Sequence, residues 1–247
     1  MGRSGEPRVI HLTFDQDWAP AWATERLAKR VQDAGLRATL FVTHDCPSLA
    51  VLRSSGACEL GWHPNFLPGS SHGEDVETVL DFMAKIVPEA VGARAHTLMR
   101  GTPILEAYKR RGLRYDAADL HDGVANLEVF QSWTGVSRIP IWFEDDVHLQ
   151  RGLGCELEAL DLDAPGLKIC TFHPVLVALN CADLESYGAL KNDLAARGIG
   201  LTDATVEDFA RFRQSDRPGV SDLFEALVSW LETRPESAGG GLATLID

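Results

Sequence analysis

Short apolar runs alternate along the chain with longer segments in which apolar residues recur every three or four positions. The short runs favour strands, and the longer segments favour amphipathic helices that end at glycine or proline. Strand candidates lie at 8–14, 36–43, 57–63, 93–98, 113–118, 127–133, 138–143 and 167–172. Helix candidates lie at 20–35, 73–88, 103–112, 184–198, 204–214 and 221–233. This alternation predicts an α/β fold with a parallel sheet and crossover helices, and about seven such units favour closure into a barrel.

The domain organisation is expected to be simple. A chain of 247 residues suits a single α/β barrel. We expect one domain over residues 1–235. The last residues, 236–247, contain three consecutive glycines and are expected to form a tail or a loosely docked end.

Composition and charge argue against several classes of partner. The chain has 36 acidic and 23 basic residues and a net charge of −13, which argues against nucleic acid or an anionic membrane as a partner. No apolar run approaches the roughly 18 residues that a membrane span needs. The N-terminus lacks the apolar region of a signal peptide, and five cysteines without CxxC spacing suit a reducing compartment. A cytoplasmic location is therefore expected, while the oligomeric state stays open.

Ionisable residues gather at or near the ends of several predicted strands. In a parallel barrel the carboxyl ends of the strands converge on one face, which holds the active site. This shared placement favours a functional site over scattered structural charges. The residues concerned are Asp15, Asp17, His63, His96, the acidic run 144–146 and His173.

Each of these residues also has a structural interpretation. Asp15 and Asp17 project to the same side of an extended chain, so one could bind a metal and the other act as a base. Asp17 is equally suited to cap the helix that begins near Pro20. Single histidines are often packed in the core, and an acidic run is often a solvated turn. No GxSxG, P-loop or GxGxxG motif occurs, which removes the commonest serine hydrolase and nucleotide-binding signatures.

Five motifs in a fixed order carry a family resemblance. They are TFDQDWAP (13–20), GWHPNF (61–66), RAHTL (94–98), RIPIWFEDD (138–146) and TFHP (171–174). This order resembles the polysaccharide deacetylases, which form the chitooligosaccharide deacetylase homology family, or carbohydrate esterase family 4. The WbmS-like branch, associated with bacterial surface polysaccharides, is the closer match. The resemblance spans residues 8 to about 180.

The resemblance implies a distorted (β/α)7-type barrel and metal-dependent removal of an N-acetyl group from a sugar. By this likeness, Asp15 matches the catalytic base and His173 the catalytic acid. Arg94 matches the arginine that orients the base. Asp17 and His63 match two of the metal ligands.

The third metal ligand departs from the family pattern. The family places a second histidine four residues after His63, where this chain has Leu67. We expect His96 to replace it, because His96 lies near the end of a neighbouring predicted strand. His72, in a Gly/Ser loop, is the alternative. One carboxylate and two imidazoles suit one divalent ion, with zinc favoured and iron, cobalt, nickel or manganese possible.

Further residues of these motifs are expected to contact a carbohydrate substrate: Trp18, Asn65, Trp142, Glu144 and Asp145. Core packing is nearly as good an explanation for the tryptophans. The acidic run could instead supply a neighbour that keeps His173 protonated.

Two other functions remain open at this stage. One is metal-dependent hydrolysis of another C–N bond, such as that of a cyclic ureide or a small amide, on the same barrel. The other is a non-catalytic sugar-binding relative that has lost its metal, which the metal content of the purified protein would distinguish.

Overall fold

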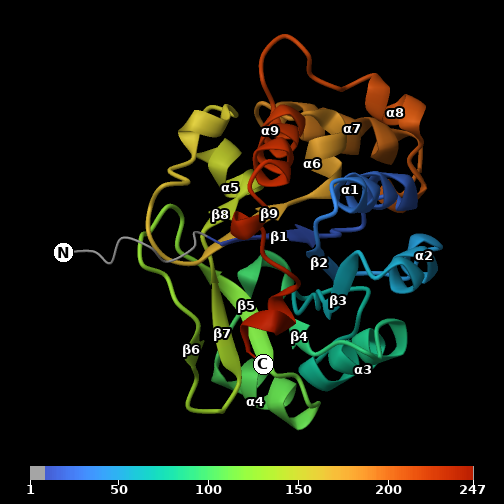
Figure 1. Cartoon of the computed structure of the whole chain (residues 1–247). Coiled ribbons are helices and arrows are strands. Elements are labelled where there is room, and N and C mark those ends of the chain that lie inside the picture. Colours follow the sequence, from blue (N-terminus) through green and yellow to red (C-terminus); the bar gives the residue numbers. More distant parts are fainter. Residues whose placement is uncertain (1–8, 247) are drawn as a thin grey trace.

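Residues 9–246 fold around one sheet of nine strands with helices on its outside (Figure 1). This computed structural model describes residues 9–246. Residues 1–8 and residue 247 lie outside the described residues. The expectation that the N-terminus is not a signal peptide concerns residues 1–8 and therefore stays a prediction. The strand order is β6-β7-β5-β4-β3-β2-β1-β9-β8, and every adjacent pair is parallel except β6 and β7. The predicted α/β class with a mostly parallel sheet is confirmed.

The strands are short, and most are followed by a helix. The strands are β1 (Ile10–Asp15), β2 (Ala38–Val42), β3 (Cys58–Trp62), β4 (Gly92–Ala93), β5 (Tyr115–Leu120), β6 (Phe130–Gln131), β7 (Ser137–Ile141), β8 (Phe143–Glu144) and β9 (Lys168–Phe172). The helices are α1 (Ala21–Asp33), α2 (Ser48–Ser55), α3 (Val76–Ile86), α4 (Thr102–Arg110), α5 (Asp145–Gln150), α6 (Pro174–Leu179), α7 (Glu185–Ala196), α8 (Val206–Ala210) and α9 (Val220–Glu232).

One nearly continuous extended run closes the barrel. Its first part, β7, pairs with β5, as in the register of Ile141 with Leu120. Its second part, β8, pairs with β9, where Glu144 lies opposite Thr171. The run therefore joins β5 to β9 and brings the end of β8 beside the ends of β9 and β1.

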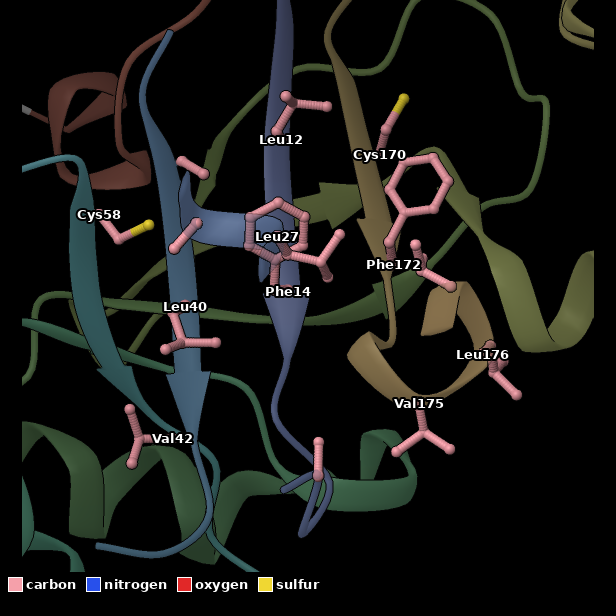
Figure 2. Close-up of a cluster of buried hydrophobic side chains, with 14 of the residues drawn as sticks. Leu12, Phe14, Leu27, Leu40, Val42, Cys58, Cys170, Phe172, Val175 and Leu176 are labelled. Atoms are coloured by element: carbon pink, nitrogen blue, oxygen red, sulfur yellow. The ribbon is translucent and has the colours of Figure 1, made fainter. Parts of the chain in front are cut away.

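Two apolar clusters lie on the two faces of the curved sheet. Figure 2 shows the outer cluster, in which Leu12 and Phe14 of β1 and Phe172 of β9 are grouped with Leu27 of α1. The inner cluster includes Phe41, Tyr115, Ile139 and Ile169 and fills the barrel. Because side chains alternate along a strand, burying Leu12 and Phe14 outside turns Thr13 and Asp15 into the barrel.

The C-terminal segment packs against the barrel at the starts of β1, β2 and β3. The Gly239 N–H donates to the Ile10 carbonyl (2.8 Å), and the Leu242 N–H donates to Thr39 Oγ1 (2.9 Å). Leu242 itself is fully buried in the inner cluster. In Figure 1 this segment is the red stretch of chain that runs from α9 to the C-terminus.

Three predicted elements differ from the structure. The strand expected at 93–98 ends at Ala93, because the chain turns away from the sheet and the His96 N–H donates to the Pro64 carbonyl. The strand at 127–133 is reduced to β6, an exposed edge strand of two residues. The helix at 204–214 is only α8, and the short helices α2, α5 and α6 were not predicted. No helix among residues 9–246 is both long and apolar enough to cross a membrane.

Candidate metal centre

A tight turn after β1 places Asp17 above the strand ends. Asp17 and Trp18 both have left-handed backbones (φ 44° and 56°), which non-glycine residues adopt at a cost in energy. Gln16 holds the turn: its carbonyl accepts from the Ala19 N–H, and its buried Oε1 accepts from the Thr43 N–H (2.9 Å). Pro20 occupies the cap position of α1, which has no side-chain cap. Asp17 is therefore positioned for the centre and does not cap the helix.

Asp17 meets two histidines from other parts of the sheet. His63 directly follows β3, and its Nε2 lies 3.0 Å from Asp17 Oδ1. His96 lies in a 3-10 turn after β4, and its Nδ1 lies 2.9 Å from the same oxygen. One ligand atom from each of the three residues lies within 4.8 Å of the other two.

His72 and Leu67 lie outside this cluster. His72 Nδ1 accepts from the Asn65 N–H (3.1 Å), and its ring stacks on Phe82 at 4.7 Å between centroids. Its Nε2 is buried and has no hydrogen-bond partner among the described residues. Leu67 is 37% exposed. The structure thus brings His96, rather than His72, together with Asp17 and His63.

The donor set fits a divalent ion. Burial would raise the pKa of Asp17, but hydrogen bonds and charge from His63 and His96 outweigh it and hold that pKa well below its usual range. One carboxylate and two imidazole nitrogens match the three protein ligands of catalytic zinc sites, which keep a coordination position open. The residues that would hold the ion are Asp17, His63 and His96.

Asp15 forms a buried ion pair next to this cluster. It ends β1 with 1% of its surface exposed, and Oδ1 accepts from Arg94 Nη1 at 2.8 Å. Arg94 is completely buried and also donates to Thr13 Oγ1 and to the Ala117 carbonyl. Three fixed contacts hold the guanidinium, which in turn fixes the direction of the Asp15 carboxylate.

His173 also lies near Asp17 and has its own carboxylate partner. Its Nδ1 lies 2.6 Å from Asp145 Oδ1, and its backbone N–H donates to Asp145 Oδ2 at 2.8 Å. Its Nε2 lies 3.6 Å from Asp17 Oδ2. Burial favours the neutral ring, but the charge and hydrogen bond of Asp145, helped by Asp17, raise the pKa of His173 well above its usual value. These contacts therefore favour the protonated ring, whose Nε2 lies on the side of Asp17.

Two further carboxyls crowd the centre. Glu144 ends β8 with 4% of its surface exposed, and polar atoms of Asp15, Glu144 and His173 lie within 4.8 Å of one another. Burial, and then the charge of Asp146, raise the pKa of Glu144 to about 8. Burial also raises the pKa of Asp146. Burial thus favours the neutral form of Glu144, which lowers the negative charge at the centre.

The residues expected to contact substrate occupy different environments. Trp18 is half-buried, with its ring centroid 5.1 Å from that of His96. Asn65 Oδ1 accepts from the Leu67 N–H and so shapes the loop after His63. Trp142 is 3% exposed and packs in the core, and Asp145 is bound to His173. Sequence reasoning did not find the α7 residues that line a cavity beside Asp17 and His173, although a glycine inside a predicted helix was a usable signal.

His96 and His72 are distinguished by metal binding. We expect His96→Ala to weaken zinc binding by more than the roughly 10–100-fold that loss of an outer-shell partner causes. His72→Ala should keep zinc affinity within about that outer-shell range, because its Nδ1 is already bound to the backbone. Competition with a zinc-binding dye measures both affinities. Stronger zinc loss in His72→Ala than in His96→Ala would reassign the third ligand.

Comparisons with known proteins relate this chain to polysaccharide deacetylases. A family model described as WbmS-like polysaccharide deacetylase matches residues 12–191. A crystal structure from Bordetella bronchiseptica, described as a candidate polysaccharide deacetylase involved in O-antigen biosynthesis, has 30% sequence identity and a TM-score of 0.78. That match covers 90% of each chain. A search of curated proteins gave no match.

More distant structures share the fold. A peptidoglycan N-acetylglucosamine deacetylase, solved with an N-hydroxybenzamide compound, has 10% identity and a TM-score of 0.53 over 98% of this chain and 89% of its own. A candidate polysaccharide deacetylase from Mycobacterium smegmatis has 16% identity and a TM-score of 0.51 over 93% of each chain. At these identities the likeness shows the fold alone.

Proposed function

This chain belongs to the WbmS-like polysaccharide deacetylase family, and from that premise we propose that it removes an N-acetyl group from a sugar with one divalent ion, preferably zinc. One observation carries the proposal. The candidate metal ligands lie beside a carboxylate that an arginine orients and an imidazole that a second carboxylate holds. Hydrolysis of an amide needs both a base and an acid at the reacting bond, and this arrangement supplies both.

Asp15 is proposed as the general base. A divalent ion held by Asp17, His63 and His96 would lower the pKa of a water molecule and polarise the amide carbonyl. Asp15 is a carboxylate beside these ligands, so it can take the proton from the attacking water. Arg94 keeps one of its oxygens engaged and so directs the other toward the site. Orientation of this kind contributes to rate because the reacting groups need no rearrangement.

His173 is proposed as the general acid. Its Nδ1 is engaged by Asp145, so the proton available for transfer is the one on Nε2, which lies 3.6 Å from Asp17. Donation of that proton lets the sugar nitrogen leave as a neutral amine. Asp145 then stabilises the ring orientation through both of its oxygens.

The substrate is proposed to be a sugar of a bacterial surface polysaccharide or of its precursor. The relative with 30% identity is described as taking part in O-antigen biosynthesis, and a more distant one as acting on peptidoglycan N-acetylglucosamine. The cytoplasmic location expected from the sequence stays a prediction.

Acetate release tests the proposal. Zinc-loaded protein incubated with a panel of N-acetylated sugars should release acetate and a free amine in equal amounts, and a chelator should abolish the release. Zinc binding without acetate release from any N-acetylated sugar would contradict the proposed activity and leave another C–N bond as the target.

His173→Ala separates the acid role from a structural role. We expect amide hydrolysis to fall about 10²-fold, with zinc content unchanged, because the amine must leave without a proton. An O-acetyl analogue of the same sugar should be affected less, because an alkoxide leaves more easily than an amide nitrogen. His121→Ala, which removes an exposed imidazole, is the control. Equal losses on both substrates would indicate that His173 only positions its neighbours.

A further inference from the structure

A cavity of about 260 Å³ opens directly beside the proposed reaction site. Asp17 and His173 form part of its lining, so a group attached to the reacting amide can reach it. Helix α7 supplies Tyr187 and Gly188, and Leu184 precedes its first turn. This helix follows the last family motif along the chain.

Gly188 lies within α7, where glycine is unfavourable. Glycine in a helix interior destabilises the helix relative to alanine. The backbone at Gly188 is not left-handed, so its conformation does not require glycine. A Cβ atom built at this position meets no heavy atom within 4 Å among the described residues, so packing does not require glycine either. The remaining explanation for the glycine is the cavity, because Gly188 lines it and a side chain there would occupy part of its volume.

The other residues of the cavity have the character of a sugar site. Val175, Leu176 and Leu184 supply apolar surface, which suits the C–H groups of a sugar ring. The Lys191 ammonium lies 4.5 Å from the centroid of the Tyr187 ring, and both residues line the cavity. Tyr187 also brings a hydroxyl group to the cavity lining. Burial, and then the charge of Asp17, raise the pKa of Tyr187 to about 12, so this hydroxyl stays a donor at neutral pH.

We propose that this cavity binds the sugar ring whose acetamide is hydrolysed, and that Gly188 keeps the cavity open for that ring. Its volume is slightly below the roughly 300–1,000 Å³ of pockets for drug-sized ligands, so it suits one ring and not several linked sugars. The inference rests on the proposed function, because the ring is placed by its bond to the reacting nitrogen.

Hydroxamates test the subsite without knowledge of the natural sugar. A hydroxamate chelates a metal through two oxygens, and acetohydroxamate reproduces only the acetyl end of the substrate. N-phenylacetohydroxamate adds a ring on nitrogen, where the sugar is attached. Benzohydroxamate adds the ring on the acyl carbon. If the cavity accepts the ring on nitrogen, N-phenylacetohydroxamate should bind zinc-loaded protein about tenfold or more tightly than acetohydroxamate, through burial of the ring. Benzohydroxamate should gain much less.

Gly188→Leu should remove that gain and leave acetohydroxamate binding within about twofold. Ala189→Leu is the matched control, because Ala189 is exposed on the same helix and does not line the cavity. Gly188→Ala should raise the unfolding temperature while weakening binding of the ring, which is the opposite of what a glycine required by the fold would show.

The possible outcomes distinguish failure of the proposed function from failure of the sugar subsite. If the protein binds neither zinc nor acetohydroxamate, the proposed function fails and the subsite fails with it. If both bind but the N-phenyl ring adds no affinity, or if Gly188→Leu leaves the gain intact, the subsite alone is wrong.

Discussion

Asp15→Asn is expected to lower the rate of deacetylation by about 10²–10⁴-fold, the usual contribution of a general base. Asparagine has nearly the same shape as aspartate and its Oδ1 still accepts a hydrogen bond, so the contact from Arg94 Nη1 can persist. It cannot take a proton from water. The expected change is therefore in kcat, with zinc content retained, and a steady-state assay with elemental analysis measures both.

Asp116→Asn provides a matched control for this variant. Asp116 is also a buried aspartate beside an arginine, with Oδ2 2.9 Å from Arg138 Nε, but it is not part of the metal centre. Burial raises its pKa to about 6, and it belongs to none of the candidate metal clusters of the described residues, so its replacement should lower turnover much less than Asp15→Asn does. Near-normal turnover in Asp15→Asn would assign Asp15 to the structure of the turn. An equal loss of deacetylation rate in both variants would mean that the lower rate reflects a less stable fold and not the loss of a base.

Much of the candidate site could be predicted from the sequence, because its residues come at the ends of short apolar runs that form strands. Asp15 and His173 come directly at or after short apolar runs that form β1 and β9, and those strands are neighbours in register. A parallel sheet brings such ends together whatever the helices between them do. The position of the reactive side chains therefore depends on local pattern and sheet direction, which a single sequence shows well.

His96 shows where the sequence pattern is insufficient. The run from Ala93 to Leu98 is apolar enough to predict a strand, but buried Arg94 donates to Ala117 and Asp15, and the chain leaves the sheet after it. Thr97 and Leu98 then adopt left-handed conformations (φ 56° and 53°). These conformations depend on contacts with distant residues, so sequence periodicity could suggest His96 as a ligand but not its placement.

The α7 cavity depends on contacts that no motif records. Gly188 and Tyr187 are part of an ordinary helical pattern, and their common cavity exists only because α5, α6 and α7 assemble beside the end of β9. The closure of the barrel is a similar case. RIPIWF was predicted as one strand. In the structure its first part, in β7, pairs with β5, and its end, in β8, pairs with β9, a change of partner that local propensity does not encode.

Arg94→Leu is expected to lower the free energy of unfolding by about 3–5 kcal/mol, the usual cost of removing one partner from a buried ion pair. The guanidinium is fully buried, donates to Asp15, Thr13 and Ala117, and lies 4.4 Å from the centroid of the Phe41 ring. Leucine restores none of the hydrogen bonds and leaves the Asp15 carboxylate buried beside Glu144 without its cation. Denaturant unfolding of the metal-free protein measures the change.

A second substitution identifies the cause of that loss. Arg94→Leu combined with Asp15→Asn should be more stable than Arg94→Leu alone, because the uncompensated carboxylate is then neutral. Arg94→Lys should lie between wild type and Arg94→Leu, since an ammonium keeps the charge but cannot reproduce the branched set of contacts. Arg30→Leu removes a partly exposed arginine that pairs with Glu225 and Glu232, and it should cost no more than about 1 kcal/mol. If Arg94→Leu is no more costly than Arg30→Leu, the buried pair does not stabilise the barrel, and the orientation of Asp15 must come from another contact.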